Sequence, residues 1–162
     1  MPIRLGSKST VVELKISDAH VLSSMSSRWI ESTKKSGRFS PYNWNNSIEV
    51  KIDTLDSMIN IGIPTFIKID VKGYELEVLQ GLSEPIKYLS LEFTADDIEE
   101  SFHCLNHLDS LGSYRYNISL GESLLFKNSN WESLVSFKST IKHVIKENKK
   151  SWGDIYAIKN PT

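Results

Sequence analysis

The stretch Thr65–Phe93 constrains the fold of this chain more than any other, because it has the pattern of a complete β-α-β unit. Its first part, Phe66–Val71, is an apolar run that predicts a strand, and the turn pair Lys72–Gly73 ends it. Apolar residues spaced as on one helical face predict a short helix over Tyr74–Gln80. Strict alternation of apolar and polar residues predicts a second strand over Tyr88–Phe93.

Three carboxylates in this unit are candidates for a shared site. A connection of this length joins parallel neighbours, so Asp70 and Glu92 are both expected at the carboxyl edge of the sheet, where open α/β sheets bind ligands. Glu75 lies between them in the first helical turn. Together they are suited to act as a general base, to orient a hydroxyl or to hold a hard cation. The alternatives are structural: Glu75 as a carboxylate at a helix N-terminus, and Glu92 as a solvent-facing residue.

The motif FIKIDVKGYELEVLQGL resembles the signature IKIDVEGxExxVLxG of the FkbM family of S-adenosylmethionine-dependent methyltransferases. Upstream, KIDTLDSMI resembles the family's TLDxLI segment, and Ser23 with Ser24 resembles its serine pair. The resemblance implies O-methylation of hydroxyls on glycans or natural products, with S-adenosylmethionine as donor. It also implies that Asp70 and Glu92 lie where donor and acceptor meet, and that Ser23 and Ser24 lie on the substrate side.

Two lysines modify this hypothesis. Lys68, two residues before Asp70, is expected on the same strand face, where it either pairs with Asp70 or reaches into water; we group it with the substrate-binding residues. Lys72 stands where the family usually has Glu, which disfavours a divalent cation and lowers the pKa of nearby carboxylates. His103 and His107 share a helical face, but they lack the further ligands that zinc requires. We therefore expect no metal site.

The resemblance covers the second half of the family's domain. None of the 8 glycines is spaced as GxG, so the glycine-rich turn that receives the donor has no counterpart. We expect one domain over residues 1–162, with an α/β fold: a partial Rossmann-like (class I methyltransferase), mainly parallel sheet with flanking helices. S-adenosylmethionine is expected to bind this chain poorly. The alternatives are a non-catalytic binding or assembly module derived from a methyltransferase, and a truncated gene product.

The flanking sequence supplies further elements. Alternating patterns over Thr10–Ser17 and Ile48–Thr54 predict two strands that pair with each other. The segment Ser23–Ser47 between them is rich in Ser and Asn and carries four large aromatic residues. It is predicted to be a loop, either packed on the core or acting as a lid over the substrate.

The second half of the chain is predicted to contain two helices and further strands. One helix begins at Asp96 as N-cap and ends at Gly112, and another covers Trp131–Lys146. Strand patterns follow the first helix over Tyr114–Ser119 and Ser123–Phe126, and a last strand covers Asp154–Lys159 as an antiparallel addition to the sheet.

Composition limits the partners. With 19 basic and 20 acidic residues, the chain has no field that would attract nucleic acid or a charged membrane. No apolar run approaches the roughly 20 residues that cross a bilayer, and no signal peptide is evident, so we expect a cytoplasmic protein with a small-molecule or glycan acceptor. The strand Phe66–Val71 would have a free edge, which we expect Thr10–Ser17, Ile48–Thr54 or a second subunit to cover.

Overall fold

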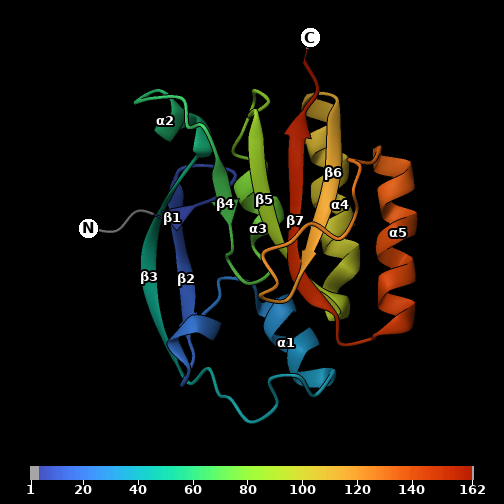
Figure 1. Ribbon diagram of the computed structural model, residues 1–162. Coiled ribbons are helices and arrows are strands. Elements are labelled where there is room, and N and C mark those ends of the chain that lie inside the picture. The colour runs from blue at the N-terminus through green and yellow to red at the C-terminus, as the bar shows by residue number, and fades with distance from the viewer. Residues whose placement is uncertain (1–3, 162) are drawn as a thin grey trace. The chain divides into compact units, whose positions relative to one another are not determined.

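The computed structural model of the protein describes residues 4–161 (Figure 1). Contacts within the chain divide it into two compact units. The first comprises two segments, the chain up to Gly62 and Val71–Leu82. The second comprises Ile63–Asp70 and the chain from Ser83 onward. The prediction of a single domain over residues 1–162 stays a prediction.

The first unit contains a three-stranded sheet in the order β1-β3-β2. Its strands are β1 (Arg4–Leu5), β2 (Thr10–Ile16) and β3 (Asn46–Asp53). β2 and β3 are antiparallel, with Val12 opposite Val50, and β1 runs parallel to β3. The predicted pairing of the two N-terminal strands is therefore confirmed.

The segment Ser23–Ser47 is not a continuous loop, because it contains helix α1 (Ser27–Lys35), which follows a 3-10 turn at His20–Leu22. The hydroxyl of Ser26 caps α1 by accepting a hydrogen bond from the Trp29 N–H at 3.1 Å. Serine-rich sequence is typical of loops, so the sequence pattern predicted no helix in this segment. A serine at the N-cap is nevertheless a common helix start.

The aromatic residues of this segment form a small core of the first unit. Trp29 is 4% exposed and packs against Phe39 and Trp44, with ring centroids 5.8 Å and 6.5 Å away. The indole N–H of Trp44 donates to the Leu22 carbonyl at 2.8 Å. These contacts favour the interpretation of a packed segment over that of a lid. Two short helices complete the unit: α2 (Leu55–Ile59) and α3 (Glu75–Leu79), the latter within the range predicted for the β-α-β helix.

The second unit contains a four-stranded sheet in the order β4-β5-β7-β6. Its strands are β4 (Ile67–Ile69), β5 (Tyr88–Thr94), β6 (Tyr114–Leu120) and β7 (Trp152–Lys159). Only β4 and β5 are parallel, since β7 lies between β5 and β6 and is antiparallel to both. The α/β class is confirmed, but the expected mainly parallel sheet is wrong for the described residues.

Helices α4 (Ile98–Leu111) and α5 (Leu134–Glu147) pack on one face of this sheet, against β5 and β6 respectively (Figure 1). The strands bury alternate residues on that face, which include Leu89, Leu91, Phe93, Tyr116, Ile118, Ile155 and Ala157. We refer to the opposite face as the open face. The N-cap of α4 is Asp97, without a side-chain cap, and not Asp96, because the 3-10 turn Ala95–Asp97 precedes the helix.

Two predictions need correction: the strand at Ser123–Phe126 and the covering of the second edge of β4 by an N-terminal strand. Ser123–Phe126 forms no strand and makes only an isolated bridge between Phe126 and Ser119. Within residues 4–161, no strand pairs with the second edge of β4. The N-terminal strands pair with each other instead, so the expectation that one of them covers this edge is wrong. Coverage by a second subunit stays a prediction.

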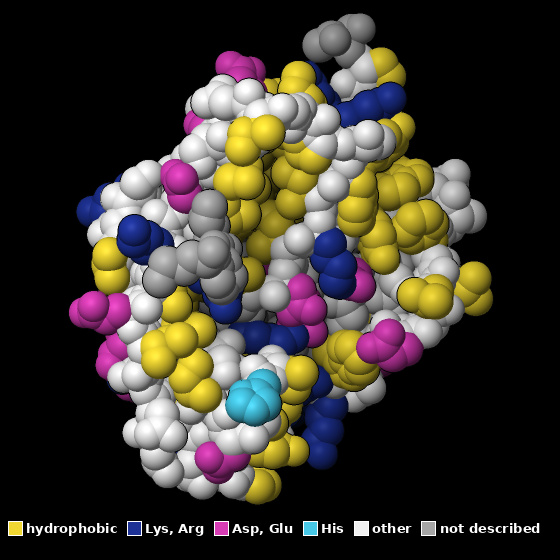
Figure 2. Space-filling model, turned by 90° about the vertical axis from the view of Figure 1, so that its left-hand side faces the viewer, with side chains coloured by type: hydrophobic (Ala, Val, Ile, Leu, Met, Phe, Trp, Pro, Cys, Tyr) yellow, Lys and Arg dark blue, Asp and Glu magenta, His cyan; other side chains and the backbone are white. Residues whose placement is uncertain are grey.

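The described helices include none that is both long and apolar enough to span a membrane. On the face shown in Figure 2, basic and acidic side chains are interspersed, and neither sign forms a continuous patch. This distribution agrees with the near-balance of charge in the sequence.

Candidate active site

Two carboxylates on neighbouring strands and a third that directly follows another strand are the candidates on the open face of the second unit. Glu92 on β5 lies opposite Asp154 on β7. Asp70 directly follows β4, whose last residue Ile69 pairs with Leu91, and its charge acts on Lys68. Side chains alternate between the faces of a strand, which places this row on the face opposite the buried Leu91. We call Asp70, Glu92 and Asp154 the acidic row; Asp70 is exposed, whereas the other two are partly buried.

A lysine neutralises part of this row. The Nζ atom of Lys68 lies 2.5 Å from Oδ1 of Asp154, with side chains that are 48% and 23% exposed. Partial burial lowers the pKa of Lys68, but the hydrogen bond and charge of Asp154 and the charge of Asp70 outweigh it, so the pKa is raised above its ordinary value. The sequence suggested Asp70 as the partner of Lys68. The hydrogen-bonded partner is Asp154, which sequence reasoning missed as a site residue.

Aromatic rings extend the open face beside the acidic row. The rings of Phe66 and Tyr156 are stacked, with centroids 6.5 Å apart. The Phe126 ring contacts Tyr156 and Trp131 edge-on, with centroid distances of 5.2 Å in both pairs. We call these four residues the aromatic platform. Phe66 and Phe126 are 47% and 52% exposed, which leaves ring surface accessible. The alternation of Phe66, Lys68 and Asp70 with two isoleucines was the signal for a common face, but the partners from β7 and residues 126–131 carried no such signal.

Ser90 lies beneath this surface on the central strand β5. It is paired with Lys68 on one side and Tyr156 on the other. The Ser90 hydroxyl is buried and has no hydrogen-bond partner among the described residues. Such a hydroxyl costs about 1–3 kcal/mol relative to a satisfied one.

The turn that follows Asp70 belongs to the first unit and is fixed by its own contacts. Lys72 and Gly73 both have positive φ, 52° and 83°. A Cβ atom at Gly73 would lie 2.2 Å from Cβ of Trp29, so α1 packs directly on the glycine. Glu75, only 7% exposed, accepts a hydrogen bond from the Val71 N–H at 3.2 Å. In the structure, Glu75 therefore helps to hold this turn.

The serine pair also makes structural contacts in the first unit. The Ser24 hydroxyl donates to the Lys72 carbonyl at 2.6 Å and accepts from the Ser26 N–H at 2.9 Å. The Ser23 hydroxyl accepts from the Ser17 N–H at 3.2 Å. Of the predicted site residues, Asp70, Glu92 and Lys68 belong to the second unit, whereas Glu75, Ser23 and Ser24 belong to the first, where Glu75 and Ser24 contact the turn. Substrate binding by the serines stays a prediction.

A metal ion requires several grouped ligands, and a glycine-rich donor turn requires open space beside its glycines. Within residues 4–161, no three His, Cys, Asp or Glu side chains are grouped to hold a metal ion. The two glycines of the FIKIDVKGYELEVLQGL motif, Gly73 and Gly81, are closed by packing. Trp29 fills the space beside Gly73, and a Cβ at Gly81 would lie 2.2 Å from the Gly6 carbonyl oxygen. Neither of these two glycines therefore leaves room for a ligand against its backbone.

Comparison with models of protein families shows which family the chain belongs to. The Methyltransferase FkbM domain matches residues 5–118, which is more than half of the 162-residue chain. The chain belongs to the FkbM methyltransferase family. The family resemblance of the motif around Asp70 is thereby confirmed. A search of curated proteins and a search of solved structures returned no match. The matched region contains Asp70 and Glu92, whereas Asp154 and three rings of the aromatic platform lie beyond it.

Proposed function

We propose that this FkbM-family chain supplies the acceptor side of a methyl transfer from S-adenosylmethionine to a hydroxyl group. The observation that carries the proposal is the acidic row, two of whose residues come from the family's own domain. In this proposal the parallel strands β4 and β5 represent the part of a Rossmann-like sheet whose carboxyl edge receives the substrate.

Asp70 is the proposed general base. It is the most exposed member of the acidic row, so an acceptor hydroxyl can reach its carboxylate. The carboxylate would accept the hydroxyl's proton, and a positioned base of this kind contributes about 10²–10⁴-fold in rate. Glu92 would orient the hydroxyl, while Lys68, held by Asp154, would offer a donor to a neighbouring oxygen.

The acceptor would be a small molecule or a glycan with a ring. Exposed aromatic rings bind flat apolar surfaces, including the less polar face of a sugar ring, while the carboxylates and Lys68 bind hydroxyl groups. The aromatic platform lies along the same open face as the acidic row, since Tyr156 and Asp154 are two residues apart on β7. One ligand of two or three rings would contact both.

A second candidate is a non-catalytic binding module derived from such an enzyme. It is favoured by the packed glycines, because neither Gly73 nor Gly81 leaves room for a donor. In this case the open face would bind the acceptor without transferring a methyl group to it.

Two measurements separate these candidates. In the second candidate, calorimetric titration of the chain with S-adenosylmethionine shows weak binding or none, whereas saturation at micromolar concentration would favour the first candidate and contradict the second. Methyl transfer is then followed with a panel of ring-containing hydroxyl compounds. Asp70→Asn should lower the rate about 10²–10⁴-fold, whereas Glu122→Gln, an exposed carboxylate in the turn after β6, should leave it unchanged. Equal rates for these two variants would exclude Asp70 as the base.

A further inference from the structure

The second unit contains a pocket of about 530 Å³ whose residues are not part of the candidate active site. Its walls come from the chain before β4, the chain leading into β5, and the end of β7. They are mostly apolar and include Pro64, Pro85, Pro161, Ile63, Ile158 and Tyr88. This volume lies in the range of about 300–1,000 Å³ that is usual for small-molecule sites.

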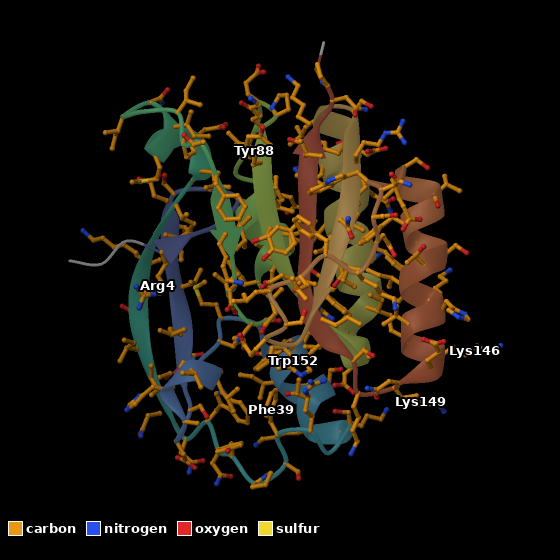
Figure 3. The ribbon with its side chains drawn as sticks, in the orientation of Figure 1. Arg4, Phe39, Tyr88, Lys146, Lys149 and Trp152 are labelled. Atoms are coloured by element: carbon orange, nitrogen blue, oxygen red, sulfur yellow. The ribbon has the colours of Figure 1, made fainter. Side chains whose placement is uncertain are left out.

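The pocket and the acidic row lie at opposite ends of the sheet. Tyr88, labelled in Figure 3, begins β5 and lines the pocket, whereas Glu92 lies four residues further along the same strand. At about 3.3 Å per residue, this separates them by about 13 Å. A ligand in the pocket would therefore leave the acidic row open.

Prolines and hydrogen bonds restrain the walls of the pocket. Three of the chain's 5 prolines line it, and each has a fixed φ angle. The hydroxyl of Tyr114 donates to the Ile86 carbonyl at 2.7 Å, and burial raises the pKa of Tyr114 to about 12, so this donor persists at neutral pH. The Lys159 N–H donates to the Lys87 carbonyl at 2.9 Å. Little conformational entropy would be lost on binding.

The charge of the lining is entirely positive. Lys87 and Lys159 are its two charged residues, and no acidic side chain lines the pocket. The Nζ atom of Lys87 lies 5.1 Å from the centroid of the Tyr88 ring, so it is held at the rim over an aromatic wall. An ammonium group beside apolar walls complements a molecule that is anionic at one end and apolar at the other.

We propose that this pocket binds an organic anion with an apolar ring body, at a site separate from the acceptor site. The prolines, isoleucines and Tyr88 would contact the ring, and Lys87 and Lys159 would bind the anionic group. The proposal does not depend on methyl transfer, because none of these residues belongs to the acidic row or the aromatic platform.

The test compares two ring compounds that differ in charge, naphthalene-2-sulfonate and naphthalene-2-methanol, in titrations followed by amide chemical shifts of the full chain. The sulfonate should bind several-fold more tightly, with the largest shifts at Tyr88 and Ile158. Lys87→Gln and Lys159→Gln should each weaken its binding about 2- to 5-fold, as expected for partly exposed ion pairs. Ile63→Asp should weaken it further, because it replaces an apolar lining residue with a negative charge that repels the sulfonate; Ile63 is 83% exposed, so the core is undisturbed.

The control is Lys146→Gln, since Lys146 lies on α5 and does not line the pocket (Figure 3). It should bind the sulfonate as the unchanged chain does. Equal affinity for the two compounds would overturn the proposed role of the lysines. Shifts centred on Phe66 and Phe126, or no binding of either compound at millimolar concentration, would overturn the site itself.

Discussion

The turn Val71–Gly73 and the acidic row are adjacent in sequence at Asp70, but their side chains do different work. Around the turn, Ser24, Trp29 and Glu75 direct their polar atoms or rings at the backbone of the turn itself. In the acidic row, Glu92 and Asp154 lie opposite each other on β5 and β7, and Asp70 directly follows β4. A single sequence signature thus contains residues that set the backbone and residues that are available for chemistry. The difference predicts that mutations at the turn act on stability, whereas those in the row act on function.

The largest effect is expected at Gly73. Gly73→Ala adds a Cβ atom 2.2 Å from Trp29 at a φ of 83°, so both clash and backbone strain should destabilise the chain by about 3 kcal/mol or more. Gly37→Ala is the matched control, because Gly37 has a φ of 81° and no atom within 4 Å of the added Cβ. It should cost only about 1–2 kcal/mol. Urea unfolding measures both, and equal costs would show that Trp29 does not pack on Gly73 in solution.

A smaller loss is expected at Ser24. Ser24→Ala removes a buried donor to the Lys72 carbonyl and an acceptor for the Ser26 N–H. Because both hydrogen bonds of the buried hydroxyl are lost, the free energy of unfolding should fall by about 1–3 kcal/mol. Thermal unfolding tests this, and an unchanged melting temperature would mean that water replaces the hydroxyl.

The ion pair on the open face should contribute less. A double-mutant cycle with Lys68→Gln and Asp154→Asn should give a coupling energy of about 0.2–1 kcal/mol, since both side chains are partly solvated. The pKa of Lys68 is raised in the folded chain, so this stabilisation is complete below the unfolded pKa of about 10.4 and is lost as pH rises above it. The free energy of unfolding should therefore fall more between about pH 8 and about pH 11 for the unchanged chain than for Lys68→Gln.

The smallest effect, with the opposite sign, is expected at Ser90. Ser24 and Ser90 are both 1% exposed, but only the Ser24 hydroxyl has hydrogen-bond partners. Ser90→Ala removes an unsatisfied hydroxyl and should be neutral or stabilise the chain by up to about 1 kcal/mol. A loss comparable to that of Ser24→Ala would show that the Ser90 hydroxyl has a partner in solution, such as a bound water.

The local sequence pattern predicted those strands and helices that depend on residues close together in the chain. Alternation placed β4 and β5, and parallel pairing then placed Asp70 and Glu92 at one edge. The position of β7 between β5 and β6 could not be predicted in this way, because the order of strands depends on contacts between distant segments. Asp154 and Tyr156 were therefore missed as neighbours of Lys68 and Phe66. Helix α1 was missed because its buried face has only Trp29, Ile30 and Thr33 among serines and charged residues.

The central position of β7 also sets an order for folding during synthesis. β5 and β6 do not pair with each other, so each has its principal sheet partner only when Trp152–Lys159 has left the ribosome. Until then, the apolar faces of β5, β6 and α4 lack some of their final contacts and stay partly exposed. Such intermediates are prone to aggregation. A chain with this topology depends on its late-made strand to close the sheet, so a ribosome stalled before Trp152 would carry a second unit that cannot finish folding.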